Sequence, residues 1–242
     1  GWNRAVANLS SEQLRFDAQG NFSIVVSKER PAGQRDWLPM EDDVHMVMVR
    51  QYYHGREGAA ESTFKIRNLD APEFTPATDS EMAARLRSAS GFFNDTVDGA
   101  IALAQMFTDA PNTTEPPLSY SADFGGIFYP TFDNEYFGGW FYLAEDEALV
   151  IEGPVPEASY WSVSLQNRWM QSLDAEQYQV ALNDKQIKTE NGRYRVVVSA
   201  RQPPTGNWLN TAGKREGLLA IRYQLSADSD GPTLRLVKFD AL

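Results

Sequence analysis

Polar groups gather directly after an alternating segment in the second half of the chain. Two amides, a guanidinium and a carboxylate occur there as Asn167, Gln171, Arg168 and Asp174. Amides hydrogen-bond hydroxyl groups, a guanidinium neutralises an anionic group, and a carboxylate acts as a base or orients water. These residue types in one short stretch predict a binding site for a polar small molecule. The alternative interpretation is that the Asn167 amide ties down a loop.

A second polar segment holds an indole between amides. It comprises Asn207, Trp208 and Asn210, directly after a turn at residues 203–206. An indole offers a flat face for a sugar ring, and neighbouring amides can bind the ring hydroxyl groups. If the two segments meet, we expect one pocket at one end of the fold. The alternative is that Trp208 plugs the end of the core.

Candidates for catalysis are few. Hydrolysis of a glycosidic bond requires two carboxyl groups at a defined separation, and Asp174 with Glu147 is the best pair. His54, near the end of an expected strand, is a candidate general base. The alternative interpretation is that Asp174 and Glu147 are solvated surface carboxylates and that His54 is an ordinary turn histidine. A serine hydrolase is disfavoured because the chain contains no Gly-x-Ser-x-Gly motif.

The elements that would position these groups are mostly short strands. Alternation over residues 160–167 puts Trp161, Val163 and Leu165 on one face, with Asn167 at its end. Residues 207–213 are expected to form a loop. Asn191-Gly192 predicts a hairpin turn. Further strands are expected at residues 21–27, 44–53, 62–68, 148–152, 177–182, 193–200, 217–225 and 233–239.

The hydrophobic period becomes helical between residues 78 and 109, where Met82, Leu86 and Phe93 recur at helical spacing. Thr78 or Asp79 is the expected N-cap, and Gly91 and Gly99 are expected to divide the segment into two helices. Short strands with one helical segment predict a mainly β fold. We expect an antiparallel jelly-roll-type β-sandwich with a helical insertion at 78–109, in a single domain spanning 1–242.

The segment 160–174, together with 207–213, resembles the DUF1214 domain, a bacterial family of unknown function. Residues 138–150 and 37–53 fit the same pattern. The resemblance implies a jelly-roll β-sandwich similar in fold to peptide N-glycosidase F, in a family whose members are often joined to a second domain, DUF1254. Asn210 stands where the family pattern has Asp, and Lys214 stands where it has His.

Composition excludes several classes of function. The net charge is −11, so binding to nucleic acid or to an anionic membrane surface is disfavoured. No apolar run is long enough to span a membrane. The chain lacks cysteine and has only His45 and His54, so thiolate sites are excluded and a site with several histidines is hard to build. We expect no metal site and no cofactor, and any metal bound through oxygen ligands would be calcium or magnesium. We favour the cytoplasm over the periplasm and expect the chain to be a fragment of a longer native protein.

Two functions are therefore open. The first is an enzyme or enzyme-like protein, such as a hydrolase, that binds a polar or carbohydrate-like small molecule. The second is a non-catalytic binding or assembly module, for which a second copy of the chain is a further possible partner.

Overall fold

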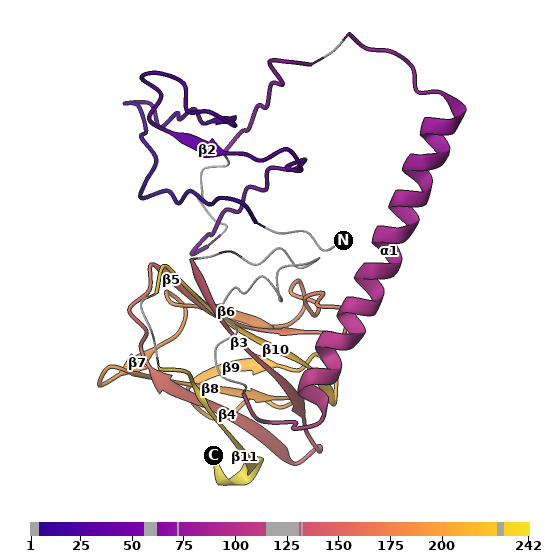
Figure 1. Cartoon of the computed structure of the whole chain (residues 1–242). Coiled ribbons are helices and arrows are strands. Elements are labelled where there is room, and N and C mark those ends of the chain that lie inside the picture. The colour runs from indigo at the N-terminus through magenta and orange to yellow at the C-terminus, as the bar shows by residue number, and fades with distance from the viewer. Residues whose placement is uncertain (1–4, 56–61, 72, 115–130, 132, 227–229) are drawn as a thin grey trace.

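Two β-sheets pack face to face around the main hydrophobic core (Figure 1). The computed structural model describes residues 5–55, 62–71, 73–114, 131, 133–226 and 230–242. The first sheet is antiparallel, in the order β3 (Asn134–Tyr142), β10 (Glu216–Gln224), β5 (Tyr160–Gln166) and β6 (Ala181–Asn183). The second has the order β11 (Thr233–Lys238), β4 (Glu147–Pro154), β8 (Arg193–Ser199) and β7 (Thr189–Glu190). These sheets form the β-sandwich that the sequence predicts.

Alternation in the strands produces the core. Trp161, Val163 and Leu165 of β5 are buried, as predicted, because successive side chains of a strand point to opposite faces. They face buried side chains of β4 and β8 such as Leu149 and Val196. The predicted hairpin at Asn191-Gly192 is confirmed, since it joins β7 to β8 with both residues at positive φ.

One expected loop is a strand. Residues Asn207–Asn210 form β9, which pairs in parallel with β8 and extends the second sheet. The expectation of a loop over 207–213 was wrong for these four residues. The turn residues beside this segment favour a loop on local grounds. The open edge of β8, with which β9 pairs, exists only once the sheet has assembled.

The helical insertion is one helix, α1 (Asp79–Thr108), and not two. Thr78 is its N-cap and forms a capping box with Glu81, so the predicted start is confirmed. The expected breaks at Gly91 and Gly99 were wrong. A glycine inside a helix costs roughly 1 kcal/mol relative to alanine, which the remaining turns offset.

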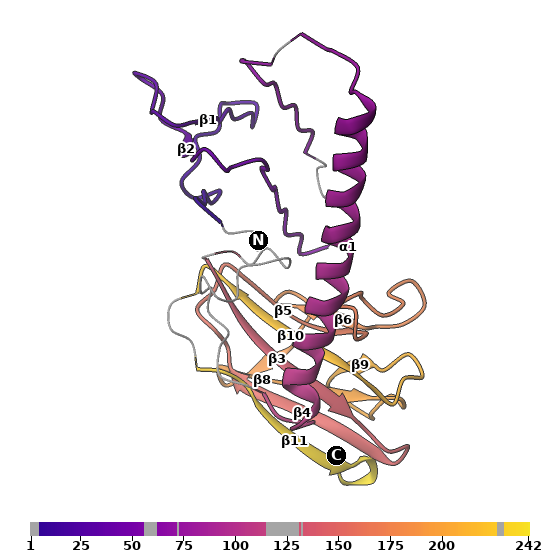
Figure 2. The ribbon, with the colours of Figure 1, turned by 45° about the vertical axis from the view of Figure 1, so that its right-hand side comes forward.

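The C-terminal half of α1 lies against the outer face of β3. Leu103 and Phe107 form a second, smaller core with Trp140 of β3 and Leu218 of β10. Gly138 makes this approach possible, because a Cβ there would overlap the Phe107 ring. The N-terminal half of α1 continues beyond the sandwich (Figure 2). Nearly all of its side chains are exposed.

The described part of the chain before α1 forms an arm with little regular structure. Its strands are β1 (Val25–Ser27) and β2 (Trp37–Pro39), which pair in parallel. The expected strands at 44–53 and 62–68 were wrong, and only the last three residues of 21–27 are a strand. Residues 44–53 are apolar on both faces and residues 62–68 do alternate. A strand nevertheless requires a neighbour for its backbone hydrogen bonds, and the sandwich offers none here. At the other end of the chain, η2 (Phe239–Ala241) follows β11.

Candidate functional site

A crevice of about 200 Å³ lies between the last turns of α1 and the turn that follows β5. Helix, sheet and turn each contribute to its wall. The lining residues are Ile101, Ala104, Gln105, Thr108, Trp140, Arg168 and Trp169. It therefore combines two indoles, one guanidinium and two neutral polar side chains.

The Asn167 side chain forms three hydrogen bonds within the turn that follows β5. Its Oδ1 accepts hydrogen bonds from the backbone N–H groups of Trp169, at 2.9 Å, and Gln171, at 3.1 Å. Its Nδ2 donates to Gln171 Oε1 at 2.8 Å. Met170 adopts a positive φ of 62° within this turn. These contacts fit the alternative interpretation, in which the Asn167 amide ties down a loop. Because the loop is tied down in this way, Arg168 and Trp169 are held at the crevice.

Glu216 stands beside the polar end of the crevice. Its Oε2 accepts a hydrogen bond from Trp140 Nε1 at 3.4 Å, and its Oε1 lies 3.7 Å from Arg168 Nη2. Trp140 is only 3% exposed, whereas Trp169 is 45% exposed. The buried indole is thus a fixed floor, and the exposed one is free to cover a bound ring.

Of the residues predicted in the first polar segment, Arg168 lines the crevice. Asp174 instead closes a turn, because its Oδ1 accepts hydrogen bonds from Glu176 N at 3.0 Å and Gln177 N at 3.1 Å. Gln171 is held by Asn167. Asn167, Gln171 and Asp174 therefore satisfy backbone and amide groups within their own loop.

The second polar segment has separate partners. Asn207 Nδ2 donates to Lys188 O at 2.9 Å and to Arg195 O at 2.8 Å, which fastens β9 to the β7–β8 hairpin. Trp208 Nε1 donates to Ser199 O at 3.1 Å, and Asn210 Oδ1 accepts from Ala212 N at 2.8 Å. Within the described ranges, no hydrogen bond joins 207–210 to 167–171. A pocket shared by the two segments stays a prediction.

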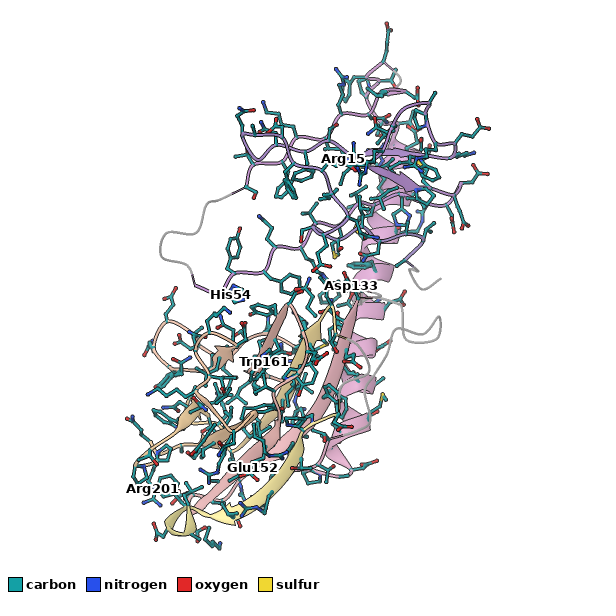
Figure 3. All side chains as sticks on the ribbon, turned by 90° about the vertical axis from the view of Figure 1, so that its left-hand side faces the viewer. Arg15, His54, Asp133, Glu152, Trp161 and Arg201 are labelled. Atoms are coloured by element: carbon teal, nitrogen blue, oxygen red, sulfur yellow. The ribbon has the colours of Figure 1, made fainter. Side chains whose placement is uncertain are left out.

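The remaining catalytic candidates lie in different places. Glu147 Oε2 accepts a hydrogen bond from Ala144 N at 2.9 Å, in the turn between β3 and β4. His54 Nε2 lies 3.1 Å from Asp184 Oδ1, where the arm reaches the sandwich (Figure 3). The His54 ring also packs on Tyr160, with centroids 5.6 Å apart. Glu147, Asp174 and His54 share no hydrogen-bonding partner in the part of the chain that the structure describes.

Sequence reasoning missed most of the crevice. Trp140 drew attention only as part of residues 138–150, which fit the pattern of the resemblance, and its outward position follows from the strand register that tertiary pairing fixes. Gln105 and Thr108 carry no signal of their own on the helix. Over the described residues, no group of three or more His, Asp or Glu side chains could hold a metal ion, and no helix is both long and apolar enough to cross a membrane.

The model of DUF1214, a protein family of unknown function, matches residues 2–56 and 129–227, which is more than half of the chain. The chain belongs to the DUF1214 family. No curated protein matches this DUF1214 chain. It is similar to a crystal structure of an uncharacterised protein from Burkholderia cenocepacia, with 29% identity and a TM-score of 0.85. That match covers 97% of this chain but 64% of the other, so the chain spans less than two thirds of its relative.

A protein from Vibrio parahaemolyticus also matches, with 20% identity and a TM-score of 0.38, over 69% of this chain and 48% of that one.

The two segments matched by the DUF1214 model meet where the arm reaches the sandwich. Asn183 Nδ2 donates to His54 O at 2.9 Å, and the Tyr52 and Tyr160 rings lie 5.3 Å apart. Helix α1 belongs to neither matched segment.

Proposed function

We propose that this DUF1214 chain binds a small polar, carbohydrate-like molecule with an anionic group in the crevice between α1 and the turn after β5. The observation that carries the proposal is the convergence of Arg168, Trp169 and Trp140 on one hollow. Rings stack on sugar faces, and a guanidinium binds a carboxylate in a bidentate manner.

The size of the crevice limits the ligand. A volume of about 200 Å³ is below the roughly 300–1,000 Å³ of sites for drug-sized ligands. One ring bearing one charged substituent suits it better than an oligosaccharide. An acidic monosaccharide, such as a uronic acid, is the class that matches both the indoles and Arg168.

Binding is better supported than hydrolysis. No carboxylate lines the crevice among the residues described, and Glu216 beside it is a single acid. Glycosidases place two carboxyl groups about 5–10 Å apart across the scissile bond. Asp174 and Glu147 share no hydrogen-bonding partner among the described residues, and their pairing for hydrolysis stays a prediction. The function that we propose is therefore non-catalytic recognition.

Tryptophan fluorescence tests the proposal. Glucuronate should quench or shift the emission of exposed Trp169 in a saturable manner, and neutral glucose should bind more weakly because it lacks a partner for Arg168. Arg168→Gln should weaken glucuronate binding by about tenfold and leave glucose unaffected, as the loss of one charge-assisted hydrogen bond predicts.

Arg215→Gln is the matched control. Arg215 is also exposed and stacks on Tyr142, with its Cζ 4.7 Å from the ring centroid, but it does not line the crevice. Equal losses in the two arginine variants, or equal binding of glucose and glucuronate, would contradict the proposal.

A further inference from the structure

An arginine stands on the outer face of the first sheet, away from the crevice. Tyr223 of β10 points into the core and is 0% exposed, so Arg222 beside it points outward. In the ladder, Arg222 lies opposite Tyr136 of β3 and Ser162 of β5. This position is fixed by strands on both sides.

Two tyrosine rings flank the guanidinium. The Arg222 Cζ lies 5.2 Å from the centroid of Tyr136 and 6.0 Å from that of Tyr52, which the arm contributes. Both distances fall within the range of cation–π attraction. The side chain is therefore flanked by aromatic faces, and a ring face offers no oxygen acceptor to the N–H groups of a guanidinium.

The donors of Arg222 are not used inside the described protein. Its Nε is buried and has no acceptor, and the side chain forms no ion pair or hydrogen bond with any residue that the structure describes. Buried polar atoms are nearly always paired, and an unpaired donor of a charged group is especially costly. The expected partner is an oxygen acceptor from outside this part of the chain.

A second unpaired atom lies on the same face. Asn134 is 4% exposed and stands diagonally from Arg222, since Asn134 pairs with Gln224. Its Nδ2 donates to Tyr52 Oη at 3.4 Å, while its Oδ1 is buried without a donor. Diagonal residues on a sheet face lie roughly 7–8 Å apart, which one small molecule can bridge.

We propose that Arg222 and Asn134 form a second binding site, for a small oxyanion that also carries a hydroxyl group. The carboxylate or phosphate oxygens accept from Arg222, and the hydroxyl donates to Asn134 Oδ1. Tyr52 and Tyr136 hold the guanidinium in place. All four residues lie in the ranges that the DUF1214 model matches, whereas the helical wall of the crevice does not.

The test is a titration followed through the arginine Nε–Hε signals in two-dimensional NMR spectra. Three probes are added separately to the full chain: glycolate, acetate and inorganic phosphate. The Arg222 signal should shift to saturation with glycolate. Acetate lacks the hydroxyl and should bind about fivefold more weakly, which is the effect of one hydrogen bond. If phosphate binds more tightly than glycolate, the ligand is assigned as phosphate-bearing. If phosphate binds more weakly than glycolate, the ligand is assigned as a hydroxycarboxylate.

Arg222→Lys keeps the charge but removes the fork of donors and the arginine signal itself, so this variant is followed through the side-chain amide signal of Asn134. That signal should shift to saturation with glycolate in the unaltered chain and should no longer do so in Arg222→Lys. Arg168→Lys, in the crevice, should leave glycolate binding unchanged, which separates this site from the proposed function. The proposal is overturned if the Arg222 signal of the unaltered chain stays fixed with all three anions. It is equally overturned if chloride at matched ionic strength produces the same shift.

Discussion

At the scale of the residue, two tyrosines place a polar pair inside an apolar core. The hydroxyl groups of Tyr194 and Tyr223 lie 2.8 Å apart, and both side chains are buried. Tyr194 packs on Trp161 at 4.8 Å between centroids, and Tyr223 packs on Phe137 at 5.0 Å. Because the two hydroxyls satisfy each other, the pair joins the two sheets without leaving an unpaired polar group.

Removing one hydroxyl should be worse than removing both. Tyr223→Phe leaves the buried Tyr194 hydroxyl without a partner, and should lower the free energy of unfolding by about 1–3 kcal/mol. The double variant Tyr194→Phe/Tyr223→Phe should lose less than the sum of the two single losses. Urea denaturation of the four proteins of this cycle measures the coupling, and strict additivity would contradict the pairing.

The same pair predicts a loss of stability in alkali. Burial, more than any other cause, raises the pKa of Tyr223 to about 12 and also raises the pKa of Tyr194. An unfolded tyrosine ionises near 10, so the folded state keeps its protons longer. The contribution is complete below pH 10 and is lost progressively as pH rises from about 10 to about 12. The measurement is the urea concentration at the midpoint of unfolding, taken at several pH values in that window. The midpoint should fall more steeply with pH in the parent chain than in the double phenylalanine variant.

At the scale of the element, α1 consists of a packed half and an exposed half. Gly138→Ala should push the Phe107 ring off β3 and cost about 1–3 kcal/mol, which is typical of overpacking. Gly91→Ala, in the exposed half where an added Cβ meets nothing, should instead gain roughly 0.5–1 kcal/mol. Thermal unfolding followed by circular dichroism compares the two. A stabilising Gly138→Ala would show that the helix does not dock as described.

At the scale of the whole molecule, one face of α1 is apolar along its length but packed along only part of it. Helical spacing aligns Met82, Leu86 and Phe93 with the buried Ala100 and Phe107. Leu86 is 65% exposed and Phe93 is 67% exposed. Exposed apolar surface of this kind binds hydrophobic dyes and promotes association.

Charge placed on that surface should be tolerated by the fold. Leu86→Glu/Phe93→Glu should reduce binding of the dye ANS and leave the free energy of unfolding within about 0.5 kcal/mol of the parent chain. Leu103→Ala, in the packed half, is the control and should cost about 2–5 kcal/mol. A destabilised double glutamate variant would mean that the exposed half is packed in solution, for example against a second copy.

The sequence by itself determined the class of the fold and many of its elements. Alternation identifies β5 and its buried face, the N-cap signal at Thr78 or Asp79 locates the start of α1, and Asn191-Gly192 defines a hairpin. These are local signals, because side-chain period, capping and positive φ are properties of a few neighbouring residues.

Tertiary structure decided the rest. Residues 44–53 are apolar on both faces but lack a neighbouring strand, while Asn207–Asn210 became β9 because β8 offers an open edge. Asn167 was predicted to bind a ligand, and in the structure it positions Arg168 and Trp169. Trp140 comes to lie beside them only because β3 pairs with β10. A strand or a site depends on partners distant in the chain, and those are brought together only by folding.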